Sequence, residues 1–442
     1  MNRHRLDVLF LLPLFVISWN TVRFSPGSAE TTWYDLAIAA FLLAFLFDRV
    51  RGRDSAIDRR AAAVAGFMLA FLAVYLAGFV NLDSREAAGF WTKGVIAWSL
   101  HALYLVCGIA HVVRRGGDLY GRAIRWLVAG FAATCAYGLV QLAVQVGAGV
   151  NLDRIVVGTL TLGQGRTTGI NVFGQVAGSE NIYRINSLTG DPNHLGVFLC
   201  IPLLLLLPRY LADPGGGHRL GLLLAFLFAV QALTLSRSAL LGDVVGLAVL
   251  FPMIRPILPP ARAIGLALAA LAAAFAALYA ASGFVQTVVR ARTQTSGRGT
   301  DIHLEFYQLV PQALDPHPLL GLGFNTYAVF YEFVTGKSDY SPHSFWIATL
   351  VETGLLGLGL YLVWFAYLAA SALAMRRSGD ADAARLGAGW TAALAGTAAA
   401  NFFYLTMQYA LFFVVAMLVV SGAALYARER VVARAPAGTL AR

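Results

Sequence analysis

The sequence has few charged residues and few cysteines for its length. Of its 442 residues only 13% are Asp, Glu, Lys or Arg, whereas a soluble globular chain carries roughly a quarter. The three cysteines, Cys107, Cys135 and Cys200, all lie in apolar segments and have the spacing of neither a disulfide framework nor a metal site. These scarcities exclude a soluble globular domain and a disulfide-rich secreted domain.

Long apolar segments dominate what is present. Hydrophobic residues make up 58% of the chain, and the mean hydropathy is +0.68. A helix of about 20 apolar residues crosses the roughly 30 Å hydrocarbon core of a bilayer. About twelve segments approach that length, at 6–20, 33–48, 61–80, 94–113, 124–148, 194–212, 219–236, 238–254, 262–283, 354–375, 386–405 and 408–427. We therefore predict an all-α integral membrane protein, a single polytopic domain over residues 1–442 with about 12 transmembrane helices.

The basic residues indicate the orientation. Short loops such as 49–60, 114–125 and 376–385 hold many of the 33 Lys and Arg residues, and loops of this kind stay in the cytoplasm. This places the N-terminus inside and two long loops, 149–193 and 284–342, on the periplasmic or extracellular side. The short inside loops also account for the net charge of +10, so we expect no nucleic-acid partner.

The two long loops have different patterns. Residues 159–169 are rich in Gly and Thr, which predicts a loop or a short β-hairpin. In the second loop, between the ninth and tenth spans, the apolar face of residues 301–314 predicts an amphipathic helix against the outer membrane surface. Thr300 or Asp301 would cap this helix, and Asp315-Pro316 would end it.

Four polar motifs lie at the outer ends of spans or in the outside loops. Arginine is costly near the membrane core unless it is paired or hydrated, so these positions are candidate sites. Guanidinium groups match two phosphate oxygens at once, and three of them would form a metal-free pyrophosphate clamp. Histidine can accept a hydroxyl proton near neutral pH. The motifs are Arg184 with Asp191-Pro192-Asn193-His194, then Ser236-Arg237-Ser238, Ser296-Gly297-Arg298 and Pro342-His343-Ser344.

Each motif also has a purely structural interpretation. Arg237 would then reach lipid headgroup phosphates, and His343 would cap its own helix. Arg184 and Arg298 would pair with Asp191 and Asp301. The functional interpretation is favoured because motifs that are distant in the sequence reach the same side of one membrane.

With these motifs the chain resembles the O-antigen ligase and polymerase superfamily, over roughly residues 184–360. The resemblance rests on five segments in order. These are Arg184 with Gly190-Asp191-Pro192-Asn193, Leu235-Ser236-Arg237-Ser238-Ala239, Ser296-Gly297-Arg298, Asp315-Pro316-His317-Pro318-Leu319-Leu320-Gly321-Leu322-Gly323, and His343-Ser344-Phe345-Trp346 with Glu352-Thr353-Gly354-Leu355-Leu356-Gly357. One departure is Ser344, which replaces the Asn that usually follows the histidine.

The resemblance implies a glycosyltransferase that moves a glycan from undecaprenyl pyrophosphate to an acceptor sugar hydroxyl outside the bacterial cytoplasmic membrane. By resemblance, Arg237 and Arg298 hold the pyrophosphate, His343 activates the acceptor, and Arg184 is a third cation. We expect Asn193, His194, Glu305 and Tyr307 to bind substrate. No cofactor or metal is expected. The implied partners are the lipid-linked donor, an acceptor that is either a lipid-linked repeat unit or lipid A core, membrane lipids and a chain-length regulator.

The acceptor separates two activities within this class. A polymerase uses another lipid-linked repeat unit, and a ligase uses lipid A core; the long 149–193 loop favours the former and the superfamily name the latter. The alternative from another class is a polytopic transporter or a lipid-linked glycan flippase, which should have related halves and polar groups at the bilayer midplane. A scaffold subunit would leave the Arg and His residues unexplained.

Overall fold

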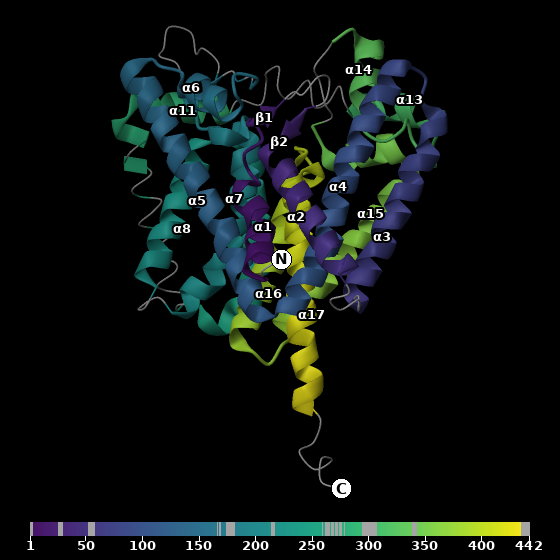
Figure 1. The fold of residues 1–442 in the computed structure, drawn as a ribbon. Helices are drawn as coiled ribbons and strands as arrows, with labels where there is room; N and C mark the ends of the chain where they lie inside the picture. The colour runs from purple at the N-terminus through teal and green to yellow at the C-terminus, as the bar shows by residue number, and fades with distance from the viewer. Residues whose placement is uncertain are drawn as a thin grey trace.

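The computed structural model describes residues 3–24, 30–51, 58–165, 167, 169–173, 182–213, 217–258, 279–293, 307–337 and 343–434, together with isolated positions between 260 and 277. Within these ranges the protein is mainly α-helical (Figure 1). The longer helices are α1 (Arg3–Val16), α2 (Trp33–Val50), α3 (Arg59–Ala77), α4 (Arg85–Arg115), α5 (Gly117–Ala148), α7 (Pro192–Ala212), α8 (His218–Leu233), α9 (Arg237–Ile254), α15 (Phe345–Arg376), α16 (Ala381–Ala400) and α17 (Ala410–Arg434).

Shorter elements gather at one end of the bundle, which we call the loop end (Figure 1). The C-terminus projects from the opposite end. The helices at or near the loop end are α6 (Leu152–Leu160), α11 (Gly283–Thr293), α13 (Val310–Leu314) and α14 (Tyr327–Thr335). Two antiparallel hairpins also occur, β1 (Arg23–Phe24) with β2 (Thr31–Thr32) and β3 (Asn171–Phe173) with β4 (Ile182–Arg184). The single-turn 3-10 helices are η1 (Gly78–Asn81), η2 (Ser187–Thr189), η3 (Arg255–Ile257) and η4 (Thr406–Gln408).

Six of the described helices are long and apolar enough to cross a membrane by length and composition. They comprise α3 with η1, α4, α5, α7, α9 with η3, and α15. Helices α1, α2, α8, α16 and α17 also occupy predicted spans but are shorter or less apolar. The predicted span 262–283 falls largely outside the described residues. The chain is therefore an all-α, multi-pass membrane protein, and a total of about twelve spans remains a prediction.

Helix α16 is the most closely packed of the helices that position the loop end. Most of its residues are buried, and it is composed largely of Ala and Gly. A Cβ atom at Gly396 would lie 2.5 Å from the carbonyl oxygen of Gly242 on α9, and one at Gly389 would lie 2.7 Å from that of Leu205 on α7. Small residues allow such close helix contacts in membranes. This packing brings the start of α7, the start of α9 and the end of α16 together.

Helix α15 contains a break at Gly354, which has φ 65° and ψ −167°. Backbone N–H groups of Leu322 and Gly323 donate to the carbonyls of Val351 and Glu352 at 2.9 and 3.0 Å. The turns at 318–323 are therefore hydrogen-bonded to α15 on both sides of the break, since Leu355 and Leu356 also donate to the carbonyls of Pro318 and Leu319. This contact explains why the glycine-containing motifs at 315–323 and 352–357 occur together: they form one joint.

The first long loop differs from the prediction in detail. Thr159 and Leu160 belong to helix α6, and the hairpin lies later, where Asn171 pairs with Arg184. Asp153 fixes this loop to α5, because its buried carboxylate accepts hydrogen bonds from the side chains of Tyr137 and Gln141. The second loop is described only in part. Its predicted helix 301–314 ends at Leu314 as expected, whereas the proposed caps Thr300 and Asp301 lie outside the described residues.

Candidate functional site

The candidate site begins at the N-terminus of α7. Gly190 has φ +80°, a conformation that favours glycine, and Pro192 is suited to the first turn of a helix. The Asp191 carboxylate caps the helix by accepting hydrogen bonds from the backbone N–H groups of Asn193 and His194 at 2.7 and 3.0 Å. The sequence Gly-Asp-Pro-Asn-His thus fixes three polar side chains at one helix end.

Arg184 is held against this helix end. It lies at the end of β4 and is only 7% exposed. Its Nε donates to the carbonyl of Thr234 at 2.8 Å, and its Nη2 donates to Oδ1 of Asn193 at 2.7 Å. Burial lowers the pKa of Arg184, the negative charge of Asp191 opposes that decrease, and the positive charge of Arg237 adds to it. Because Arg184 bonds the carbonyl of Thr234, three residues before Arg237, the two arginines belong to the same end of the bundle.

Arg237 reaches this position from a tight turn between α8 and α9. Leu235 has φ +52°, and Ser236 caps α9 by accepting a hydrogen bond from the N–H of Ala239 at 3.3 Å. Arg237 is the first residue of α9 and is exposed, whereas its neighbours Ser236 and Ser238 are buried. Two arginines some fifty residues apart in the sequence thus lie at the same end of the bundle.

Two histidines and two tyrosines lie beside the capped helix end. The His194 ring contacts the rings of Tyr404 and Tyr409, with centroids 4.8 and 4.7 Å apart, and the His343 ring lies 6.3 Å from that of Tyr404. Burial lowers the pKa of His343; the charge of Asp191 opposes this decrease and that of His194 adds to it. The lowered pKa favours the neutral imidazole of His343 near neutral pH.

Tyr404 connects these groups to the capping residues. The side chains of Asp191 and Asn193 both act on the Tyr404 hydroxyl, and burial raises its pKa well above the usual value. We call Arg184, Asp191, Asn193, His194, Arg237, His343 and Tyr404 the Arg/His cluster.

Sequence reasoning missed Tyr404 and Tyr409 as site residues. Tyr404 was placed inside the predicted span 386–405, but α16 ends at Ala400 and a loop follows. Asn401 closes this loop, because its Oδ1 accepts hydrogen bonds from the N–H groups of Thr406 and Met407 at 2.7 and 3.0 Å. The available signal was this Asn, a poor helix former, immediately before a run of aromatic residues.

The same loop positions His343. The N–H of Phe345 donates to the carbonyls of Asn401 and Tyr404 at 2.9 and 2.8 Å. Ser344, which stands where the resembling family has Asn, caps α15 by accepting from the N–H of Ile347 at 3.4 Å. Ser344 thus has a structural role: it fixes the start of α15 directly after His343.

Three predicted site residues are not seen in the cluster. Arg298 and Glu305 lie outside the described residues. Tyr307 is exposed and donates its hydroxyl to the carbonyl of Phe402 at 2.9 Å, in the loop that carries Tyr404. Within the described ranges, no group of three or more His, Cys, Asp or Glu side chains is arranged to hold a metal ion.

The geometry defines a polytopic membrane protein with cationic and imidazole groups gathered at one end of its helices. A family model described as O-antigen ligase matches residues 222–362, which include Arg237 and His343. This match confirms the resemblance drawn from the motifs and assigns this region of the chain to the O-antigen ligase and polymerase superfamily. No curated protein matches the sequence. The family is one of surface polysaccharide biosynthesis, with glycosyl transfer as its chemistry.

Proposed function

We propose that this protein transfers a glycan from undecaprenyl pyrophosphate to the hydroxyl of an acceptor sugar at the loop end, outside the bacterial cytoplasmic membrane. The observation that carries the proposal is the convergence of Arg184, Arg237 and His343 around the start of α7. Two guanidinium groups that repel each other are stabilised when a dianionic diphosphate lies between them. A neutral imidazole beside them supplies the base that an attacking hydroxyl requires.

The proposed reaction is a direct displacement. The Arg184 and Arg237 side chains hold the diphosphate, with Arg298 as a third cation proposed from the sequence. His343 takes the proton of the acceptor hydroxyl while that oxygen bonds to the anomeric carbon. The bond from that carbon to the phosphate oxygen breaks, undecaprenyl pyrophosphate leaves, and the anomeric centre inverts. Asn193, His194, Glu305 and Tyr307 are proposed to contact substrate.

The arginines act mainly on the leaving group. Negative charge builds up on the diphosphate as the glycosidic bond breaks, and preorganised cations stabilise that charge more than they stabilise the ground state. Arg184 is suited to this role because Asn193 and the Thr234 carbonyl already fix its orientation. No reorganisation of this side chain is then needed during the reaction.

The test is incubation of the purified full chain with undecaprenyl-pyrophosphate repeat units, with and without lipid A core. A ladder from donor alone shows a polymerase, and product only with core shows a ligase. His343→Ala and Arg298→Ala should each lower the rate by about 100-fold or more. His218→Ala and Arg209→Ala are matched controls, because both side chains are exposed at the opposite end of the bundle. Full activity in either the His343 or the Arg298 variant would refute the assigned roles, and absence of any transfer would favour transport.

A further inference from the structure

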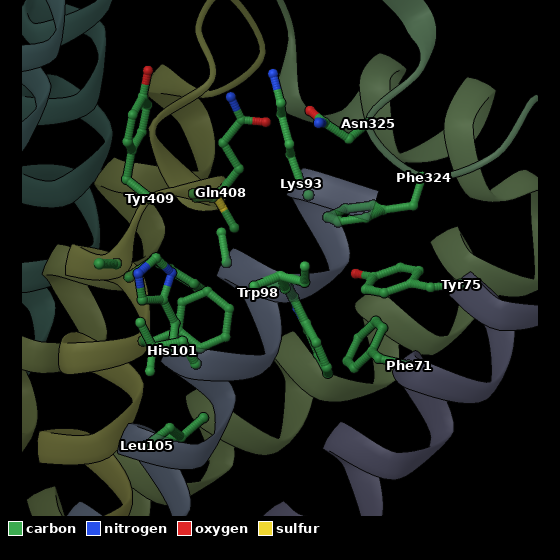
Figure 2. Close-up of a pocket in the computed structure, with 18 of the residues that line it drawn as sticks. Phe71, Tyr75, Lys93, Trp98, His101, Leu105, Phe324, Asn325, Gln408 and Tyr409 are labelled. Atoms are coloured by element: carbon green, nitrogen blue, oxygen red, sulfur yellow. The ribbon is translucent and has the colours of Figure 1, made fainter. Parts of the chain in front are cut away.

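A cavity of about 560 Å³ lies between α2, α3, α4, α15 and α17, beside the Arg/His cluster (Figure 2). Its volume is within the range of sites that enclose small organic ligands. Tyr409 belongs to both places: it lines the cavity, and its ring lies 4.7 Å from that of His194. Phe345 also lines the cavity, two residues after His343. A molecule in the cavity would therefore adjoin the proposed reaction centre.

The cavity changes in character along its depth. Lys93, His101 and Leu105 all line it from α4, at spacings that keep them on one face of the helix. The distance from Lys93 to Leu105 is about 18 Å along the helix axis, at 1.5 Å per residue. Figure 2 shows Lys93, Asn325, Gln408 and Tyr409 near one end and Phe71 and Leu105 at the other. The mouth is polar, and the floor is apolar.

Two carboxylates, those of Asp35 and Glu352, also line the cavity. Asp35 is held by Thr32, which donates from its backbone N–H at 3.0 Å and its hydroxyl at 2.7 Å, and it lies 2.9 Å from Nε2 of His101. Glu352 accepts a hydrogen bond from the N–H of Tyr327 at 3.3 Å. Arg23 and Lys93 also line the cavity, so it presents both donors and acceptors of hydrogen bonds to the hydroxyl groups of a neutral ligand.

One buried hydroxyl in the lining has no partner within the described part of the chain. Tyr361 is only 8% exposed, and its hydroxyl forms no hydrogen bond there. Such a group is unusual, because a buried polar atom without a partner destabilises the folded state. A bound polar molecule would satisfy it. This observation is independent of the carboxylates and indicates that the cavity takes a ligand with hydrogen-bonding groups.

Flat aromatic walls face the same space. The rings of Tyr75 and Phe324 stack with centroids 4.0 Å apart and an interplanar angle of 11°, and the Trp98 ring meets Tyr75 edge-on at 5.1 Å. Aromatic faces pack against the C–H faces of sugar rings, while carboxylates, amides and hydroxyls bind the sugar hydroxyl groups. A polyprenyl chain would use the aromatic walls but leave the Tyr361 hydroxyl without a partner.

We propose that this cavity is a carbohydrate-binding site that holds the acceptor glycan, with the sugar to be extended at the mouth beside Tyr409. Only the identification of the bound glycan as the acceptor rests on the proposed function. Binding of a glycan in the cavity can be measured without catalysis. Asp35, Glu352 and Tyr361 bind sugar hydroxyls, and Tyr75 and Trp98 contact ring faces.

The test compares two substitutions that each remove one tyrosine hydroxyl. Tyr361→Phe leaves the folded state intact, because the hydroxyl has no partner to lose. Tyr104→Phe is the matched control: its buried hydroxyl donates to the Phe10 carbonyl at 2.8 Å, outside the cavity lining. The probe is the sugar repeat of the organism's own surface polysaccharide, released from its lipid carrier by mild acid. Its dissociation constant is measured on the full chain in nanodiscs, together with the melting temperature.

We expect Tyr361→Phe to weaken oligosaccharide binding about five- to tenfold without lowering the melting temperature. Tyr104→Phe should lower the melting temperature and leave binding unchanged. The proposal is overturned if the oligosaccharide does not bind the wild-type chain, or if Tyr361→Phe binds it equally well. It is also overturned if undecaprenyl phosphate alone competes for the site and shows the Tyr361→Phe effect, which would identify a lipid site. Arg237→Ala separates the two proposals: it should lower the transfer rate, because Arg237 holds the donor diphosphate, and leave oligosaccharide binding unchanged.

Discussion

Arg184 and Asn193 are joined by a hydrogen bond of 2.7 Å from Nη2 of the guanidinium to the amide oxygen. The bond joins the end of a hairpin strand to the first turn of α7. The bond also helps to fix the orientation of the Arg184 guanidinium. A neutral side chain thus orients a cation of the Arg/His cluster.

Asn193→Ala should therefore impair transfer without removing any charge. Loss of the amide oxygen leaves a buried guanidinium short of an acceptor, and the free energy of unfolding should fall by about 1–3 kcal/mol. We expect the transfer rate to fall at least tenfold, because Arg184 is no longer fixed. Thermal melts and initial rates would be measured on the same preparation. Asn151→Ala, which removes the cap of α6, is the control; equal rate losses in both variants would show that the effect is only structural.

Gly354→Ala should destabilise the protein strongly. The residue has φ +65°, and a Cβ atom would lie 2.3 Å from the carbonyl carbon of Leu319. Backbone strain and the clash together should cost more than about 2 kcal/mol. Gly359→Ala, in the same helix with nothing within 4 Å of the added atom, should be neutral or stabilising by up to about 1 kcal/mol. Similar melting temperatures for the two variants would mean that the break in α15 is not required.

The pH dependence of transfer should report on His343. Its pKa is below that of an exposed histidine, because it is buried and lies near His194. The rate should thus fall with acid only below the usual histidine range, as the imidazole becomes protonated. Asp191→Asn keeps a capping side chain but removes the charge that raises the pKa of His343. The acid limb should then move to lower pH, and a shift to higher pH would contradict the electrostatic account.

The lowered pKa of His343 should also make the stability of the folded protein depend on pH. Because the pKa of His343 is lower in the folded state than in the unfolded chain, the unfolded chain binds more protons between the two values. The free energy of unfolding should increase as pH rises through that window and become constant above the unfolded pKa of about 6.5. His343→Gln should reduce this slope, which chemical unfolding at several pH values would measure.

Asp7 should be important for stability and not for transfer. Its fully buried carboxylate accepts hydrogen bonds from Arg115 at 2.6 and 3.0 Å and from Arg122 at 2.7 Å, and it lies 3.1 Å from Nε2 of His111. Asp7→Asn leaves these cations without their counter-charge, and we expect a loss of about 3–5 kcal/mol. The rate per folded molecule should be unchanged. A selective loss of rate in fully folded protein would place Asp7 in the reaction.

The sequence was informative where local rules fix the backbone. The span predicted at 194–212 corresponds to α7, which begins at Pro192 because Asp191 and Pro192 have strong preferences for the first positions of a helix. The turn around Arg237 was likewise evident from its position between two apolar segments. Placing these motifs on one side of the membrane required only the positive-inside rule.

Other features depend on tertiary packing and could not be predicted in this way. The loop that carries Tyr404 is nearly as apolar as the spans beside it, so hydropathy merged the two. Its conformation depends on Asn401 and on the N–H of Phe345, which is distant in the sequence. The cavity is formed by five separate helices, so no sequence pattern marks it. The position of Arg298 relative to the cluster remains a prediction from the sequence.

The central claim is that Arg237 and His343 act in one glycan-transfer centre, and a double-mutant cycle tests it most directly. Initial transfer rates from undecaprenyl-pyrophosphate repeat units would be compared for wild type, Arg237→Ala, His343→Ala and the double variant. Each single change should lower the rate about 100-fold or more, and the double variant should lose much less than the product of the two losses, because the residues act as a unit. Single variants that retain the wild-type rate, or losses that multiply fully, would contradict the account.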